Sequence, residues 1–444
     1  TGHGQVSSSF SSSRHADEKS SSSEQQDLVA GRLRRSLGKQ ERNVQEISYP
    51  PHKYCDGIKK IVICQGDVAE DICKQELIDN GVDIVSDMKE TLFFAVCVNT
   101  QEEIDLVSKL TRVESVEDDP PRSLLRLPGS QRTRARKSQE KTQIIPYGVD
   151  LVKATEFWDY YGSRGAGVKV CVIDSGLRVT HEDLEGVDVS GSDDEENFLP
   201  WDDPGNNAHG THVTGTIAAQ DNDVGVIGVA PEVSIYEVRV LDESGNATAS
   251  NLIEAMRACY KAEADIINMS LGGEPPSRAE QRYIRYLRNL GILVVASSGN
   301  SGYFGYSLDF PAAYHEVISV GAVDEERRVA NFSTYNEYVD LVAPGVDVIS
   351  LEVASDQSYV SYDGTSMAAP HVTGVAALLW SQFPDATVDE IDAALKESAQ
   401  DLGACGYDIH YGHGIVDVMA AAAYLENNTI TSPEIKKCVE VEIN

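Results

Sequence analysis

The sequence has no long apolar run and little positive charge. No apolar run approaches the roughly 20 residues that a membrane-spanning helix needs, so we expect no membrane span. Asp and Glu number 71 against 37 Lys and Arg, which gives a formal net charge of −34. This balance argues against a surface for nucleic acids or anionic membranes, and it suits a soluble chain that holds divalent cations.

Cysteine pairs with the CxxC spacing of zinc sites are also absent. The eight cysteines are an even number, which permits disulfides without requiring them, and bridges within residues 55–97 are among those permitted. Cys171 lies in an apolar run and is expected to be a free core thiol. The opening residues, TGHGQVSSSF, show no signal-peptide pattern. Three glycosylation sequons nevertheless favour a secreted or secretory-pathway protein: Asn246, Asn331 and Asn427.

Composition divides the chain into five segments. Residues 1–54 are rich in Ser, Gln and charge, and we expect them to form a disordered leader. Residues 55–120 alternate strand-like and helix-like runs, which indicates a small α+β domain of βαββαβ type. Residues 121–141 are rich in Pro, Gly and basic side chains, which predicts an exposed linker that proteases cut. A large domain spans residues 142–426, and a tail follows at 427–444.

The large domain has the pattern of an α/β fold. Apolar runs such as VKVCVID, ADIINMSL, ILVVAS and VISVGAV alternate with helix-like segments such as NLIEAMRACYKAE. Buried runs with intervening helices predict a mostly parallel sheet flanked by helices. Ligand chemistry in such folds lies at the carboxyl ends of the strands.

Four side chains near predicted strand ends and helix starts could carry chemistry. Asp174 ends VKVCVID, Asn300 ends ILVVASSGN, His209 lies in NNAHGTHVTG, and Ser366 lies in GTSMAAPHVTG. Each is weak alone, because Asp and Ser at such places are usually turn or helix caps. His209 and His212 lack the glutamate and spacing of the zinc motif HExxH. Together, the four supply a nucleophile, a base, an orienting carboxylate and an oxyanion donor.

The segments VIDSG, HGTHVTGT, NMSLGG, ASSGN and GTSMAAPHVTG resemble those of the subtilisin-like serine proteases, or subtilases, in the family's order of Asp, His and Ser. The resemblance covers about residues 142 to 425. It implies that Ser366 is the nucleophile, His209 its base and Asp174 the group that orients the imidazole. It makes Asn300 an oxyanion donor beside the Ser366 N–H, in a serine endopeptidase that hydrolyses peptide bonds through an acyl-enzyme.

The resemblance also implies a groove that holds polypeptide substrates as an extended strand. Its pocket for the residue before the cut would have Asp309 at the base. That carboxylate either favours Arg or Lys there, or it caps the loop or meets water. The implied groove and pocket residues are Ser270, Leu271, Gly272, Gly245, Asn246, Ala247, Ser297, Ser298, Gly299 and Asp309.

Calcium is the cofactor that the resemblance implies. Carboxylate, amide and carbonyl oxygens suit Ca²⁺. The acidic insert SDDEENFLPWDD could hold a second ion or could be a solvated loop. The implied ligands of the first ion are Gln143, Asp183, Gln220, Asn222, Val224 and Val226.

The βαββαβ segment resembles the inhibitory propeptide of subtilases, so we expect a zymogen that cuts itself and is a monomer after processing. Candidate cleavage positions are Leu125, the RTRARK cluster near Arg136, and Lys141. The Ser-rich leader, the propeptide cysteines and the acidic insert are similar to those of subtilases from protozoan parasites. Two alternatives are a catalytically inactive scaffold and an enzyme that transfers the acyl group to amines.

Overall fold

The computed structural model describes residues 55, 57–66, 68–88, 91–125, 133–137, 142–192 and 198–427. The chain divides into two compact units, Thr1–Pro51 and His52–Asn444, and every described residue belongs to the second. The expected leader lies outside the described residues, and so does all of the expected tail except Asn427. No helix in the described part is long and apolar enough to cross a bilayer.

The N-terminal domain is a four-stranded antiparallel sheet with two helices, in the predicted βαββαβ order. Its strand order is β2-β3-β1-β4. The sequence of β2 is not a clear apolar run. Four of its six side chains are only half buried and one is exposed, so the strand does not need one. The elements are β1 (Ile58–Cys64), α2 (Glu70–Asp79), β2 (Asp83–Met88), β3 (Phe93–Val98), α3 (Gln101–Val107) and β4 (Val113–Asp118).

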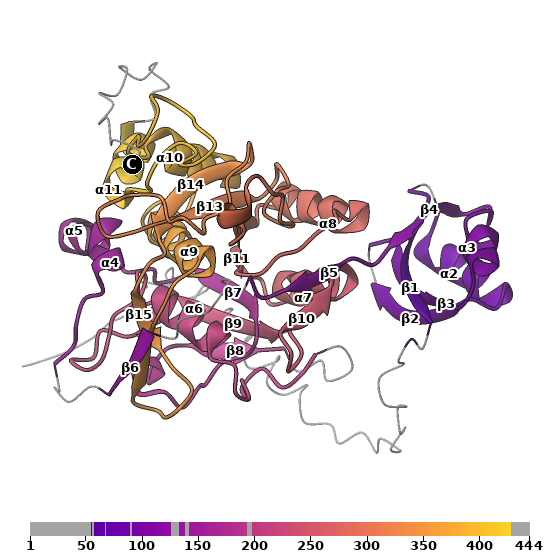
Figure 1. The fold of residues 1–444 in the computed structure, drawn as a ribbon, viewed down its shortest axis with the longest axis horizontal. Helices are drawn as coiled ribbons and strands as arrows, with labels where there is room; N and C mark the ends of the chain where they lie inside the picture. The colour runs from indigo at the N-terminus through magenta and orange to yellow at the C-terminus, as the bar shows by residue number, and fades with distance from the viewer. Residues whose placement is uncertain are drawn as a thin grey trace, which may run out of the picture. The chain divides into compact units, whose positions relative to one another are not determined.

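The large domain is built on a seven-stranded sheet in the order β14-β13-β12-β11-β7-β9-β8, and all its neighbouring strands are parallel (Figure 1). The fold class predicted from the alternating apolar runs is confirmed. Its strands are β7 (Lys169–Asp174), β8 (Val189–Gly191), β9 (Ser234–Arg239), β11 (Ile266–Met269), β12 (Leu293–Ser297), β13 (Ile318–Val323) and β14 (Val339–Pro344).

Helices and short strands complete the large domain. The helices are α4 (Tyr147–Leu151), α5 (Ala154–Tyr161), α6 (His209–Ala218), α7 (Ala249–Lys261), α8 (Arg278–Asn289), α9 (Thr365–Gln382), α10 (Val388–Glu397) and α11 (Val418–Asn427), with the 3-10 helices η1 (Glu182–Leu184) and η2 (Gly302–Phe304). The short strands are β5 (Pro121–Ser123), β6 (Thr133–Lys137), β10 (Asn246–Thr248), β15 (Val348–Leu351) and β16 (Ser358–Tyr362).

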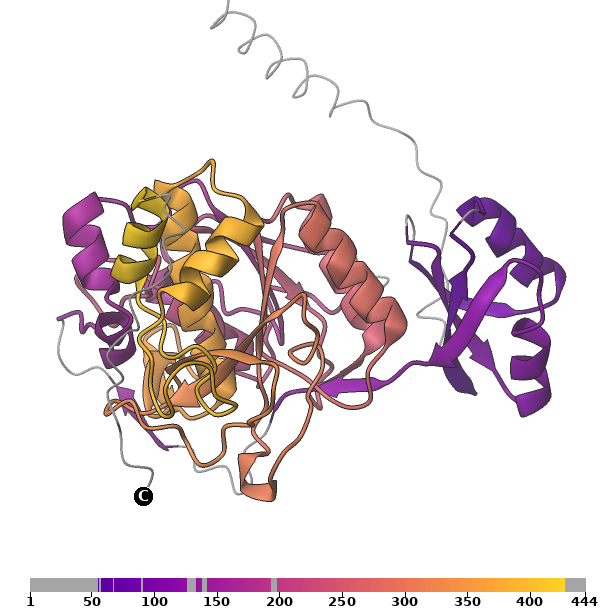
Figure 2. The same cartoon turned by 90° about the horizontal axis from the view of Figure 1, so that it is seen from above.

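The two faces of the parallel sheet are buried under different helices. Along β7, Val170 and Val172 pack into the core with α6 and α9, whereas Cys171 and Ile173 pack into the core with α7 and α8. This alternation follows from the two-residue period of a strand. Figure 2 shows α8, in salmon, on one side of the sheet and the orange and yellow helices on the other. Two covered faces explain why the strands read as continuous apolar runs.

The N-terminal sheet is also buried on both faces. Val62 and Phe94 pack with the helices α2 and α3 of the same domain. Ile61 and Phe93, which point to the opposite face, share a buried apolar cluster with residues of α7 and α8. The N-terminal domain therefore docks on these two helices of the large domain.

Disulfides join cysteines in both domains. Cys55 bonds to Cys97 and Cys64 bonds to Cys73, so bridges do form within the N-terminal segment. The free thiol expected at Cys171 is wrong, because Cys171 on β7 is bonded to Cys259 on α7. The sequence separation of 88 residues hides this contact, which exists only because α7 packs on the sheet. Cys405 is disulfide-bonded as well.

Candidate active site

Asp174 and His209 form a hydrogen-bonded pair at the carboxyl edge of the parallel sheet. Asp174 is the last residue of β7 and is fully buried, and His209 is the first residue of α6. The two carboxylate oxygens of Asp174 lie 2.9 and 3.0 Å from His209 Nδ1. Because both oxygens of this carboxylate face Nδ1, the tautomer with its proton on Nδ1 is favoured. Nε2 is then left as a proton acceptor.

Two buried titratable side chains flank this pair. Burial lowers the pKa of His212 to about 3, and its Nε2 lies 3.0 Å from the carbonyl oxygen of Val348. Burial and the nearby carboxylate of Asp174 raise the pKa of Glu237 well above its usual range. Burial thus favours the uncharged form of both side chains.

Ser366 lies in the first turn of α9 and is 2% exposed. Its Oγ donates to the carbonyl oxygen of Ser270 at 3.2 Å, which is long for a hydroxyl donor and marks a weak bond. Ser270 directly follows β11, the neighbour of β7 in the sheet, so Ser366 and Asp174 lie at the same edge. A turn about χ1 would release the Ser366 hydroxyl from Ser270.

Asn300 is held with its amide nitrogen directed into the cleft. Its Oδ1 accepts hydrogen bonds from both the N–H and the hydroxyl of Thr365, each at 3.0 Å. Nδ2 donates to the carbonyl oxygen of Leu125 at 2.6 Å. The N–H of Ser366 follows Thr365 in the first turn of α9, where backbone N–H groups have no acceptor within the helix. One side-chain donor, Asn300 Nδ2, therefore meets a carbonyl oxygen of the chain itself.

Residues 121–125 lie as an extended strand between the two predicted groove edges. β5 pairs antiparallel with β10, beside which it runs in Figure 1. Leu124 N donates to Gly245 O at 3.0 Å. On the other side, Ser123 and Gly272 exchange two backbone hydrogen bonds of 2.9 and 3.0 Å. The linker predicted to be exposed thus begins with a segment that is bound on both sides.

Asp309 and Leu125 both lie close to Gly272. A Cβ placed on Gly272 would lie 3.4 Å from both Leu125 Cδ2 and Asp309 Cβ. A Cβ on Gly299 would lie 2.2 Å from Asp309 Oδ2. Glycine at these two positions therefore leaves room for a side chain and for the carboxylate. Leu271, Ser297 and Ser298, which complete the predicted walls, are fully buried.

Asp309 has an unusual electrostatic environment. Its Oδ2 is buried without a hydrogen-bond partner among the described residues. Burial raises the pKa of Asp309 to about 6, the negative charge of Glu274 adds to this, and Arg122 opposes it. A buried carboxylate without a donor is costly when charged, so this pocket favours either a proton on Asp309 or a cation beside it.

The residues predicted to hold calcium lie together around the loop after α6. Asp183, in η1, is fully buried, and its Oδ2 accepts a hydrogen bond from Val226 N at 2.8 Å. Asn222 Nδ2 lies 3.5 Å from Asp183 Oδ1. The amide nitrogen of Gln143 donates to the carbonyl oxygens of Gln220 and Val226. The loop thus brings carbonyl, amide and carboxylate groups to one place.

The chemistry of this set fits Ca²⁺, which prefers mixed oxygen ligands. Burial raises the pKa of Asp183 to about 6, so a cation beside this carboxylate would stabilise its charged form. At Gly225, with φ of 59°, a Cβ would lie 2.4 Å from Asp183 Oδ2. The described residues include no cluster of three or more His, Cys, Asp or Glu suited to a metal, so an ion here would depend on amide and carbonyl oxygens.

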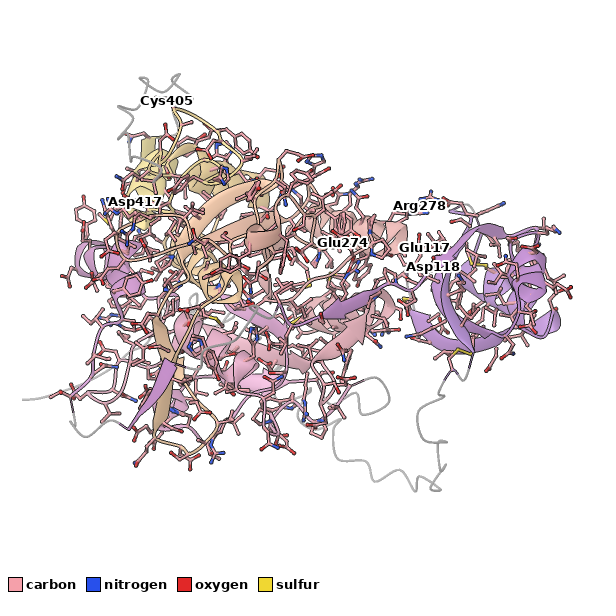
Figure 3. The ribbon with its side chains drawn as sticks, in the orientation of Figure 1. Glu117, Asp118, Glu274, Arg278, Cys405 and Asp417 are labelled. Atoms are coloured by element: carbon pink, nitrogen blue, oxygen red, sulfur yellow. A yellow bond between two sulfur atoms is a disulfide. The ribbon has the colours of Figure 1, made fainter. Side chains whose placement is uncertain are left out.

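Two acidic side chains of the N-terminal domain cap helices of the large domain. Asp119 accepts hydrogen bonds from the N–H and the hydroxyl of Ser250, at the start of α7. Glu117 accepts hydrogen bonds from the N–H groups of Arg278 and Ala279, at the start of α8; Glu117 and Arg278 are labelled in Figure 3. Carboxylates satisfy the free N–H groups at these termini and complement the helix dipoles.

Known proteins match the large domain. The Subtilase family model matches residues 165–414. Subtilisin DY from Bacillus licheniformis is 41% identical over 282 residues, which cover 63% of this chain and 99% of that protein. Subtilisin Savinase from Lederbergia lenta is 39% identical over 281 residues, which cover 63% and 99%.

A solved structure agrees with these sequence matches. The psychrophilic subtilisin-like protease Apa1 from the Antarctic psychrotroph Pseudoalteromonas sp. AS-11 aligns with a TM-score of 0.59 at 26% identity, over 64% of this chain and 98% of that chain. The class that fold and sequence define is that of the subtilisin-like serine proteases. The chain belongs to the subtilase family, and it is a serine endopeptidase.

Sequence reasoning missed three acidic side chains that lie at the groove or at the domain contact. Glu117 and Asp119 end a strand-like run, where acidic residues normally face solvent. Glu280 lies in the charge-rich helix segment AEQRYIRYLRNL, yet it is fully buried. No local pattern marks these residues, because their partners come from a distant part of the chain.

Proposed function

We propose that this chain is a calcium-stabilised zymogen that cuts itself after Leu125 and then hydrolyses polypeptides. The N-terminal domain, residues 55–120, is its inhibitory propeptide, and residues 121–125 are its first substrate. One observation carries the proposal: the carbonyl oxygen of Leu125 accepts a hydrogen bond from Asn300 Nδ2 at 2.6 Å, while the residues before it pair with both groove edges.

The first chemical step is attack on the Leu125 carbonyl carbon. Ser366 Oγ leaves its weak bond to Ser270 and gives its proton to Nε2 of His209 as the new C–O bond forms. Asp174 stabilises the imidazolium through Nδ1. The negative charge that develops on the Leu125 oxygen is stabilised by Asn300 Nδ2, which already donates to this oxygen, and by the Ser366 N–H at the start of α9.

The second step breaks the peptide bond after Leu125. His209 returns its proton to the leaving amine, and Leu125 stays bound to Ser366 as an ester. Water, activated by His209 in the same way, then hydrolyses this ester and restores the enzyme. The cleft is open to other chains once residues 121–125 leave, so the same steps apply to polypeptide substrates.

The other two candidate cleavage positions have less support. Arg136 lies in β6, which pairs with β16 at Tyr359 rather than with the groove edges. Lys141 lies outside the described residues. Leu125 is the candidate whose carbonyl oxygen meets an oxyanion donor.

Calcium and secretion belong to the same proposal. Gln143, Asp183, Asn222 and the carbonyl groups from Gln220 to Val226 would hold one ion, which supplies positive charge beside the buried carboxylate. Disulfides persist in oxidising compartments, so the bonds at Cys55–Cys97, Cys64–Cys73 and Cys171–Cys259 support secretion. The processed enzyme would act as a monomer, because one chain supplies every residue of the site.

The substitution Ser366→Ala tests this proposal. The wild-type chain should divide into two fragments, the first ending at Leu125 by mass spectrometry. The variant should stay whole and lose about a millionfold in kcat, because only binding and the oxyanion donors would remain. Self-cleavage by the variant at the normal rate would contradict the proposal. A fluorophosphonate probe that fails to label Ser366 in the processed wild type would instead favour the inactive scaffold.

A further inference from the structure

Arg122 is a fully buried arginine in a segment that also binds the cleft. Arg122 lies three residues before Leu125, and its backbone pairs with Ala247 on β10. Its side chain leaves the groove and enters the large domain, where the guanidinium meets the carboxylate of Glu280 in the first turn of α8. A buried arginine is rare unless its charge is paired, so this position has a built partner.

The contact between Arg122 and Glu280 is bidentate. Nε lies 3.1 Å from Oε1 and Nη2 lies 2.6 Å from Oε2, with both side chains fully buried. The remaining nitrogen, Nη1, donates to the carbonyl oxygens of Pro121 and Pro275 at 2.8 and 3.1 Å. Tyr314 supports the carboxylate from the other side, with its hydroxyl 2.8 Å from Oε2.

We infer that Glu280 is a specificity residue: it makes the enzyme prefer arginine as the fourth residue before the cut in polypeptide substrates. This inference rests on the proposed function, because it counts positions from a cut after Leu125. The pocket is built by the large domain from Glu280, Tyr314 and the Pro275 carbonyl, so it remains when Arg122 leaves with the propeptide.

Chemistry explains why arginine should be preferred over its analogues. The two parallel N–H donors of a guanidinium match the two oxygens of a carboxylate, whereas the ammonium of lysine is a single point charge. A leucine in this pocket would leave the Glu280 carboxylate buried with the Tyr314 hydroxyl as its neighbour, which is unfavourable. The preference therefore has both an attractive and a repulsive component.

Peptide kinetics test the inference. Reporter peptides Pro-X-Ser-Leu-Leu, which follow residues 121–125, would carry arginine, lysine, citrulline or leucine at X and be added to enzyme obtained by self-processing of the full chain. Citrulline has the shape of arginine without its charge. We expect kcat/KM to be about 10- to 100-fold higher for arginine than for citrulline, the range of a hydrogen bond to a charged group.

Two variants locate the effect. Glu280→Gln keeps the shape of the side chain and should reduce the ratio of arginine to citrulline to about one. Glu274→Gln removes the same charge from an exposed position nearby and should leave the ratio as in wild type. Because each ratio compares two peptides on one enzyme preparation, losses of folded protein cancel. A wild-type ratio near one, or a ratio that survives Glu280→Gln, would overturn the inference while the proposed function stands.

A measurement without activity separates the two proposals. In the uncut Ser366→Ala chain, melting of Arg122→Leu, Glu280→Leu and the double variant forms a double-mutant cycle. Each single variant leaves one buried charge unpaired. We therefore expect the double variant to lose less stability than the sum of the losses in the two single variants. Additive changes would show that the pair is not coupled and would overturn the inference. Peptide hydrolysis that survives Ser366→Ala would instead contradict the proposed function alone.

Discussion

Asp309 places a buried carboxylate next to a pocket that holds a leucine side chain. The two features agree if the carboxyl group carries a proton while Leu125 is bound, which the raised pKa of about 6 permits at mildly acidic pH. When Asp309 is ionised, the same pocket should favour Arg or Lys. The preference for Arg or Lys that the resemblance implies would thus belong to the ionised form of Asp309.

Substrate preference should therefore change with pH. Above a pH of about 6, Asp309 is charged, so kcat/KM for a peptide with Arg before the cut should rise relative to its Leu analogue, by about tenfold between the two limits. Effects of pH on the chemical steps that both peptides share cancel in the ratio. Asp309→Asn should give a ratio that does not vary with pH. A wild type that prefers Leu at every pH would make Asp309 a structural residue only.

Stability should change with pH at the same residue. The pKa of Asp309 rises from 3.8 in the unfolded chain to about 6 in the folded one, so the folded state holds the proton more tightly. The free energy of unfolding therefore falls as pH rises through this window, by at most about 3 kcal/mol. In the uncut Ser366→Ala chain, Asp309→Asn should match its parent below the window and melt higher above it. Equal melting at all pH values would show that Asp309 does not titrate in this window.

At the scale of elements, the contact between the two domains depends on helix ends. Asp119 and Glu117 provide side-chain acceptors for the first N–H groups of α7 and α8. Each helix also has a cap of its own, because Thr248 and Ser277 hold the N-cap positions. The carboxylates add charge at the positive ends of the dipoles, which a hydroxyl cannot do.

Removal of either carboxylate should weaken the contact between the N-terminal domain and the large domain. In the uncut Ser366→Ala chain, Asp119→Ala or Glu117→Ala should lower the free energy of unfolding by about 1 kcal/mol. Glu114→Ala is the matched control, because Glu114 binds Arg278 and Arg282 only as an exposed ion pair. Thermal melts would show whether the two caps exceed this control. Equal effects of all three would mean that charge, rather than capping, holds the domains together.

At the scale of the whole molecule, the calcium loop joins distant parts of the chain. Gln143, from the start of the large domain, meets Asp183 and the loop after α6. If calcium binds as proposed, an ion held by all three segments would bind the folded state only, and it would stabilise that state by about 4 kcal/mol when free calcium exceeds the dissociation constant a thousandfold.

Calcium removal should therefore lower the melting temperature of the processed enzyme. Excess chelator should shift the melt of wild type downward, and added Ca²⁺ should restore it. Asp183→Asn should melt low under both conditions. Asp223→Asn, which removes an exposed charge from the same loop, should keep the response of wild type. A wild-type melt that ignores the chelator would count against a resident calcium ion at this loop.

Much of this molecule follows from local sequence pattern. Continuous apolar runs predicted the parallel sheet because both of its faces are covered, and the motifs around Asp174, His209 and Ser366 predicted side chains that the fold brings to one edge. Arg122 could not be predicted, since a basic residue after two prolines looks like part of a linker until its partner Glu280 is known. The Cys171 disulfide was missed for a related reason: burial on a strand is visible in sequence, but the helix that covers it is not.

Under the proposed function, the segment at residues 121–125 is covalently part of the enzyme that it blocks. Only seven residues lie between Leu125 and Thr133 of β6, so the eight steps from one to the other span at most about 28 Å. While that connection is intact, the segment experiences a high effective concentration that does not depend on how much protein is present. Once the bond after Leu125 is cut, occupancy of the cleft follows mass action. Processed protein would then remain inactive in a concentrated store and become active on dilution, with no second protease needed.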